Sequence, residues 1–70
     1  MRCEYVKSSG IKSIGYDPAE KVLEVEFLTG HVYQYFKVPK KIYLAFISAD
    51  SKGRYFDYSI RDYYAFKKIK

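Results

Sequence analysis

The sequence predicts an α+β domain: a three-stranded antiparallel β-meander followed by one main helix and a short C-terminal helix. Three β-prone runs, residues 11–16, 21–28 and 31–38, are separated by turn residues, which is the pattern of a meander. Beyond Pro39 the apolar residues recur instead at helical spacing. The chain has 70 residues, which leaves room for one domain spanning 1–70. A domain of this size buries only ~60% of the surface that its unfolded chain exposes, so its stability is marginal.

The run from Lys21 to Leu28 has the clearest strand pattern. Its apolar positions alternate with Glu24 and Glu26, which predicts one buried and one solvated face. The preceding residues, Asp17 to Glu20, predict a turn, because Asp favours its first position and Pro its second. Residues 6–10, ahead of the first strand, predict a loop or a ragged strand.

The loop between the second and third strands decides which face the tyrosines Tyr33 and Tyr35 take. A two-residue loop with Thr29 and Gly30 at its tip needs positive φ at both, which a β-branched Thr resists, and it would put the tyrosines on the solvated face. A three-residue loop, 28–30, needs positive φ only at Gly30. We favour this loop, which puts the tyrosines on the core face. It pairs Phe27 with His31, Val25 with Tyr33 and Leu23 with Tyr35.

The helical part begins after Val38. Pro39 suits a helix start, because its missing N–H needs no partner there. Lys40 to Asp50 then has apolar residues three and four apart, which predicts the main helix, and Gly53 is its expected end. Asp57 or Ser59 is expected to cap the second, short helix.

Charge is uneven along the chain, whose net charge is +5. Residues 1–30 hold four Lys and Arg against five Asp and Glu, whereas residues 31–70 hold nine against three. The second half, which ends in a basic tail at 67–70 that we expect to be frayed, is therefore where a polyanion would bind. The commoner role of such lysines is to keep a surface solvated.

Several kinds of chemistry lack the residues that they need. Cys3 is the only cysteine, which excludes a disulfide within the chain and, together with the absence of a signal peptide, favours a reducing compartment, the cytoplasm. One Cys and one His supply a metal site poorly, and no Gly-rich phosphate loop occurs. No stretch approaches the ~18 apolar residues that a membrane span needs. We therefore expect neither an enzyme nor a cofactor nor a membrane partner.

Aromatic rings and cations together are typical of proteins that bind single-stranded nucleic acids, because rings stack on bases while Lys and Arg contact phosphates. The chain has nine Tyr and five Phe. The candidate nucleic-acid-binding residues are Tyr33, Tyr35, Lys37, Lys40, Lys41, Lys52, Arg54, Tyr55 and Arg61. Two alternatives stay open: both strand tyrosines can be structural, and Arg61 can pair with Asp57 at i,i+4 instead of contacting a ligand.

A series of short motifs runs through almost the whole chain. They are Ser8-Ser9-x-Ile11, Ile14-Gly15-Tyr16-Asp17, Leu23-x-Val25-x-Phe27, Gly30-x-Val32-Tyr33-Gln34-Tyr35, Val38-Pro39, Ala49-x-Ser51-x-Gly53-x-Tyr55-Phe56 and Ile60-Arg61. In this order and spacing they resemble the KTSC domain, which occurs at the C-terminus of some lysyl-tRNA synthetases and as a stand-alone protein in bacteria and phages. The resemblance implies a link to RNA through the synthetases, and it brings no catalytic residues.

These observations predict a non-catalytic domain that binds RNA or another single-stranded nucleic acid through a basic surface containing tyrosines. The alternative is a protein-interaction module. In that case the chain would contact a protein partner or a second copy of itself through a free sheet edge and through Val32 and Phe36, which face away from the core.

Overall fold

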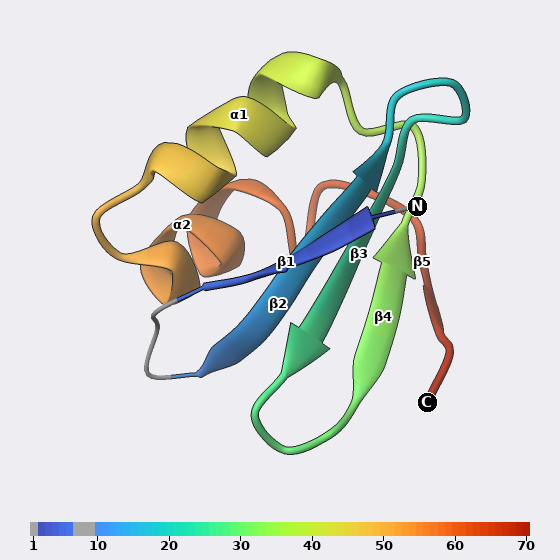
Figure 1. Ribbon diagram of the computed structural model, residues 1–70. Helices are drawn as coiled ribbons and strands as arrows, with labels where there is room; N and C mark the ends of the chain where they lie inside the picture. Colours follow the sequence, from blue (N-terminus) through green and yellow to red (C-terminus); the bar gives the residue numbers. More distant parts are fainter. Residues whose placement is uncertain (1, 7–9) are drawn as a thin grey trace.

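The computed structural model describes residues 2–6 and 10–70, which form one five-stranded antiparallel sheet and two helices (Figure 1). In chain order the elements are β1 (Arg2–Tyr5), β2 (Ile11–Asp17), β3 (Val22–Phe27), β4 (Val32–Tyr35), α1 (Lys40–Ser48), α2 (Lys52–Ser59) and β5 (Phe66–Lys68). The strands lie in the sheet in the same order as in the chain, so β1 and β5 are its edges. Both helices cover one face of the sheet (Figure 1). Residues 7–9 of the predicted loop, including Ser8 and Ser9, lie outside the described residues.

The α+β class is confirmed, but the prediction of three strands and a C-terminal helix is wrong. The three predicted runs form β2, β3 and β4, and β1 and β5 extend the sheet on either side. The tail that we expected to be frayed is the strand β5. The residues on either side of β5 continue its pairing with β4. The Phe36 N–H donates to the Ala65 carbonyl and the Val32 N–H to the Lys70 carbonyl, each at 2.9 Å. Pairing with β5 satisfies backbone groups that an edge strand β4 would leave open.

The predicted hairpin register is confirmed. Gly30 has φ of 95°, and its N–H donates to the Phe27 carbonyl at 2.9 Å, which closes the three-residue loop. Leu23 lies opposite Tyr35, and Val25 opposite Tyr33. Tyr35 is consequently a core residue, with 2% of its surface exposed. The predicted turn after β2 is also present, since Asp17 Oδ1 accepts hydrogen bonds from the N–H groups of Ala19 and Glu20.

The helices agree with the prediction in part. α1 begins at Lys40, directly after its N-cap Pro39, and ends two residues before the predicted Asp50. Gly53 is not a helix end but lies in the first turn of α2, which Ser51 caps by accepting the Arg54 N–H at 3.4 Å. A glycine inside a helix costs only about 1 kcal/mol, and burial of the Phe56 ring by α2 offsets it. Neither helix of the described residues is long and apolar enough to cross a membrane.

Phe56 joins α2 to the sheet. Its ring meets the rings of Phe27 and Tyr35 edge-on, with centroids 5.4 Å away in each case, and lies 6.2 Å from Phe46 of α1. Aromatic pairs of this geometry add stability beyond the area that they bury. The buried core comprises Ile11, Ile14, Tyr16, Leu23, Val25, Tyr35, Val38, Phe46, Phe56 and Ile60.

The face of the sheet that the helices leave uncovered is largely polar. Gln34 donates to Glu24 Oε1 at 3.0 Å, and Ser13 donates to Glu26 Oε1 at 3.2 Å. Lys12 lies 3.8 Å from the other oxygen of Glu26. The two glutamates of β3 thus hold cross-strand contacts on the solvated face, as the alternation in the sequence predicts.

Candidate functional site

A pocket of about 550 Å³ lies between α2 and the helix-covered face of the sheet. Aromatic rings form most of its wall: Phe27, Tyr33, Tyr35, Phe56 and Phe66. Its polar groups are Thr29, His31, Asp57, Arg61 and Asp62. An apolar pocket of this size with a few converging polar groups is the usual form of a small-ligand site.

Regular backbone spacing brings the wall residues together. Gly53, Phe56 and Asp57 are three and four positions apart on α2, so they share one side of that helix. Tyr33 and Tyr35 are two apart on β4 and share one face of the sheet, and Phe66 lies opposite Tyr35 in β5. The Phe66 ring is 5.8 Å from that of Tyr33 and nearly parallel to it, at 9°.

Gly53 leaves open space at the pocket wall. A Cβ atom placed on this residue would meet nothing within 4 Å. Because Gly53 lines the pocket, its missing side chain keeps one side of the pocket free. A side chain introduced at this position of α2 would extend into that open space.

The Tyr35 hydroxyl is available to a ligand. It makes no hydrogen bond with another described residue, whereas the Tyr16 hydroxyl donates to the Val38 carbonyl. Within residues 2–6 and 10–70, every fully buried side-chain nitrogen or oxygen has a partner, so the Tyr35 oxygen retains contact with the pocket space. Burial, and secondarily the neighbouring Tyr33, raises the pKa of Tyr35 to about 12. The phenol therefore keeps its proton at neutral pH and can donate it in a hydrogen bond.

The charged groups at the pocket differ in their partners. Arg61 Nη1 donates to Asp57 Oδ1 at 3.2 Å, which confirms the predicted i,i+4 ion pair. Asp62 makes neither a hydrogen bond nor an ion pair with the rest of the described chain. Its carboxylate is close enough to Tyr35 to raise the pKa of that residue, while Arg61 acts in the opposite direction. The pocket thus has one neutralised pair and one carboxylate open to a ligand.

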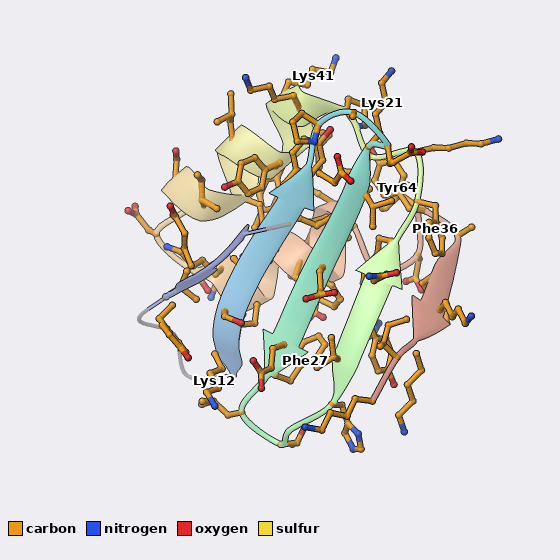
Figure 2. All side chains as sticks on the ribbon, turned by 45° about the vertical axis from the view of Figure 1, so that its right-hand side comes forward. Lys12, Lys21, Phe27, Phe36, Lys41 and Tyr64 are labelled. Atoms are coloured by element: carbon orange, nitrogen blue, oxygen red, sulfur yellow. The ribbon has the colours of Figure 1, made fainter. Side chains whose placement is uncertain are left out.

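The nine predicted nucleic-acid-binding residues fall into three groups. Tyr33, Tyr35 and Arg61 line the pocket. Lys37, Lys40 and Lys41 lie where β4 leads into α1, beside the β2–β3 turn, because the Val38 N–H donates to the Lys21 carbonyl at 2.9 Å. Figure 2 shows Lys21 and Lys41 at this end of the molecule and Phe27, a pocket residue, at the opposite end.

The third group belongs to the first turn of α2. Lys52 Nζ donates to the Ala49 carbonyl at 3.1 Å, which holds it at the helix start. The Tyr55 ring is half-buried and stacks on Phe46 with centroids 5.8 Å apart. Arg54 is exposed. Tyr55, predicted as a stacking residue for bases, therefore has a structural contact on one face of its ring.

Sequence reasoning missed the cations of the last strand. Lys68 lies opposite Tyr33, and Lys67 opposite Gln34. Since directly opposed residues share a face, Lys68 projects from the pocket side of the sheet and Lys67 from the other side. Lys70 continues the pairing through its backbone bonds with Val32. In the sequence, the only sign of this strand is that Phe66 and Lys68 alternate with Lys67. A run of three residues is too short to distinguish a strand from a frayed tail.

Comparison with known proteins gives a consistent result. Residues 7–64 match the family model of the KTSC domain. The crystal structure of a KTSC domain protein from Yersinia pestis superimposes with a TM-score of 0.93 and 44% identity, covering 99% of this chain and 97% of that one. An uncharacterised protein from Stutzerimonas stutzeri is 44% identical over 57 residues, which are 81% of this chain and 80% of that protein. A lysine–tRNA ligase from Nostoc sp. is 35% identical over 63 residues, which are 90% of this chain but 11% of the ligase.

Proposed function

This chain belongs to the KTSC domain family, and we propose that it binds single-stranded RNA, without catalysing a reaction, along the edge of the sheet formed by β4 and β5. The proposal rests on the register of these two strands. Lys68 lies opposite Tyr33, and Phe66 opposite Tyr35, so that rings and a cation share one side of a sheet edge. Aromatic rings that stack on bases, with cations nearby for phosphates, are the usual components of a single-strand site.

Charge along the final strand supports an anionic partner. Lys67, Lys68 and Lys70 are exposed, and neither β4 nor residues 63–70 contain an acidic residue. Phe66, between these lysines and the pocket, has 57% of its surface exposed. A nucleic-acid backbone that follows β5 would therefore meet several cations and at least one accessible ring.

The comparison with the ligase supports RNA rather than DNA. A segment similar to 90% of this chain is part of a lysine–tRNA ligase, an enzyme that acts on a tRNA. A domain that contacts an exposed single-stranded part of an RNA would serve such an enzyme. In this chain the residues of β4 and β5 would make the same contacts.

Fluorescence anisotropy with a labelled, unstructured RNA oligonucleotide tests the proposal. We expect binding at low salt whose affinity falls as salt rises, with a logarithmic slope of about −0.7 for each phosphate contacted. A DNA oligonucleotide of the same sequence serves as the comparison and should bind more weakly. Absence of binding at low salt, or an affinity that does not respond to salt, would contradict the proposal.

The alternative, a protein contact through Val32 and Phe36, has less support. Both side chains are partly covered, and β4, the strand that contains Val32, is paired on both sides, so a free edge exists only at β1 and β5. Sizing chromatography over a range of protein concentrations tests self-association. A dimer that dissociates on dilution, together with no RNA binding, would favour the alternative.

A further inference from the structure

We infer that the aromatic pocket receives one base turned out of the bound strand, and that this base is guanine. The inference rests on the proposed function and adds sequence preference to it, because lysines along β5 would contact phosphates whatever the sequence. Three features of the pocket support it: parallel and edge-on rings, a Tyr35 hydroxyl without a hydrogen bond to another described residue, and an exposed Asp62 carboxylate without an ion pair among those residues.

The walls suit a planar ring. The rings of Tyr33 in β4 and Phe66 in β5 lie nearly parallel, and Phe27 in β3 meets the rings of both Tyr33 and Phe56 edge-on. Bases taken out of a strand are commonly held between aromatic and apolar side chains and recognised along their Watson–Crick edge. Gly53 leaves room for such a ring beside α2.

The Tyr35 hydroxyl can donate a hydrogen bond to an acceptor on the ligand. A polar group on a side chain this deeply buried normally has a hydrogen-bond partner, as the Tyr16 hydroxyl has. Tyr35 remains protonated, so it can donate to a carbonyl oxygen that enters the pocket. This requirement favours a base that has a carbonyl group on its Watson–Crick edge.

The Asp62 carboxylate, which is exposed at the pocket, can take hydrogen bonds from a ligand. It can only accept hydrogen bonds, and its charge is not compensated by Arg61, which is paired with Asp57. A carboxylate that accepts two N–H bonds side by side makes the stronger, bidentate contact. Guanine alone among the four bases presents a carbonyl oxygen next to two adjacent N–H donors. Uracil has one such donor between two carbonyls, and adenine and cytosine place a ring acceptor beside their amino group.

Anisotropy with labelled uridine heptamers, in which only the central base is varied, tests the inference. We expect central guanine to bind roughly 10-fold more tightly than uracil, adenine or cytosine, within the range of one good bidentate contact. Inosine lacks the 2-amino group and should be intermediate. Asp62→Asn and Tyr35→Phe should each remove most of the guanine preference. Glu20→Gln, which removes one negative charge at the β2–β3 turn, is the control and should retain it.

A second variant blocks the pocket without touching its polar groups. Gly53→Leu places a side chain into the open space beside α2 and should abolish the preference for guanine. Ala45→Leu, on the exposed side of α1, adds the same side chain away from the pocket and should not. Amide spectra of both variants establish that they fold.

The outcomes separate the inference from the proposed function. Salt-dependent binding with equal affinity for all five heptamers, or with a preference for another base, overturns the guanine assignment and leaves RNA binding in place. A guanine preference that survives in both Gly53→Leu and Asp62→Asn overturns the assignment to this pocket. Failure of the wild-type protein to bind any heptamer at low salt overturns both.

Discussion

Tyr33 and Lys68 lie directly opposite each other in the β4–β5 ladder and project from the face of the sheet that the helices cover. Tyr33 contributes a ring to the wall of the pocket, and Lys68 places an exposed cation beside Tyr33 on the same face of the sheet. Arg61, the cation that lines the pocket, is engaged by Asp57, so β5 supplies the positive charge available to a phosphate. The proposed RNA site depends on this pairing of two strands that are far apart in the sequence.

Replacement of Lys68 should weaken RNA binding selectively. We expect Lys68→Ala to lower the affinity for an unstructured RNA several-fold and to reduce the logarithmic salt slope by about 0.7, because one phosphate contact is lost. Lys41→Ala, at the exposed start of α1, is the matched control and should change both much less. Equal effects of the two substitutions on the slope would argue for diffuse attraction instead of a site on β5.

Two buried tyrosines should respond differently to loss of the hydroxyl. Tyr16→Phe leaves the buried Val38 carbonyl without its donor and should lower the free energy of unfolding by about 1–3 kcal/mol. Tyr35→Phe removes a hydroxyl that has no partner among the described residues, so its effect should be within about 0.5 kcal/mol. Urea denaturation measures both, and a large loss in Tyr35→Phe would reveal a structural role for that hydroxyl.

Two glycines should give opposite results when replaced by alanine. Gly30 has φ of 95°, so Gly30→Ala should destabilise the β3–β4 hairpin by about 1–2 kcal/mol through backbone strain. Gly53 lies in α2 with free space around its Cβ position, so Gly53→Ala should stabilise the protein by up to about 1 kcal/mol through helix propensity. Thermal unfolding of the two variants beside wild type measures the difference in sign. A destabilised Gly53→Ala variant would contradict the open space assigned to that position.

Alkaline pH should destabilise the fold in part through Tyr35. Its pKa is about 12 in the folded protein against an ordinary value of 10.0, so the folded state keeps this proton at pH values where the unfolded state has lost it. The resulting stability is complete below pH 10 and is lost as the pH rises through 12. Burial also raises the pKa of Tyr16, which acts in the same direction.

Denaturation curves at increasing pH test this linkage. The free energy of unfolding of wild type should fall more steeply above pH 10 than that of Tyr35→Phe, which lacks the titrating group. Parallel slopes for the two proteins would show that Tyr35 titrates normally.

Local chemistry was sufficient to predict the centre of the sheet. Thr29 disfavours a two-residue loop and Gly30 permits the three-residue one, which determines the register of β3 and β4 and hence the burial of Tyr35. Pro39 likewise indicates the start of α1 to within one residue. These features depend on steric limits of single residues, which a sequence displays directly.

The last strand and the second helix could not be predicted in the same way. Phe66–Lys68 forms a strand because β4 offers an unpaired edge, which is a property of the fold and not of this tripeptide. Gly53 is typical of a helix end, but Ser51 caps a new helix just before it. The pocket is formed by α2 and the residues after it together with four strands of the sheet, so it is a product of the whole fold. Sequence patterns therefore identified Tyr33, Tyr35 and Arg61 but not Phe66 or Asp62.

Mapping of amide chemical shifts during titration with a guanine-containing uridine heptamer is the most direct measurement of the RNA site. The largest changes should fall on residues 32–35 and 66–70 and on the pocket side of α2 through Asp62. Changes restricted to residues 37–41 and the β2–β3 turn, or no changes at low salt, would contradict a binding site at the β4–β5 edge.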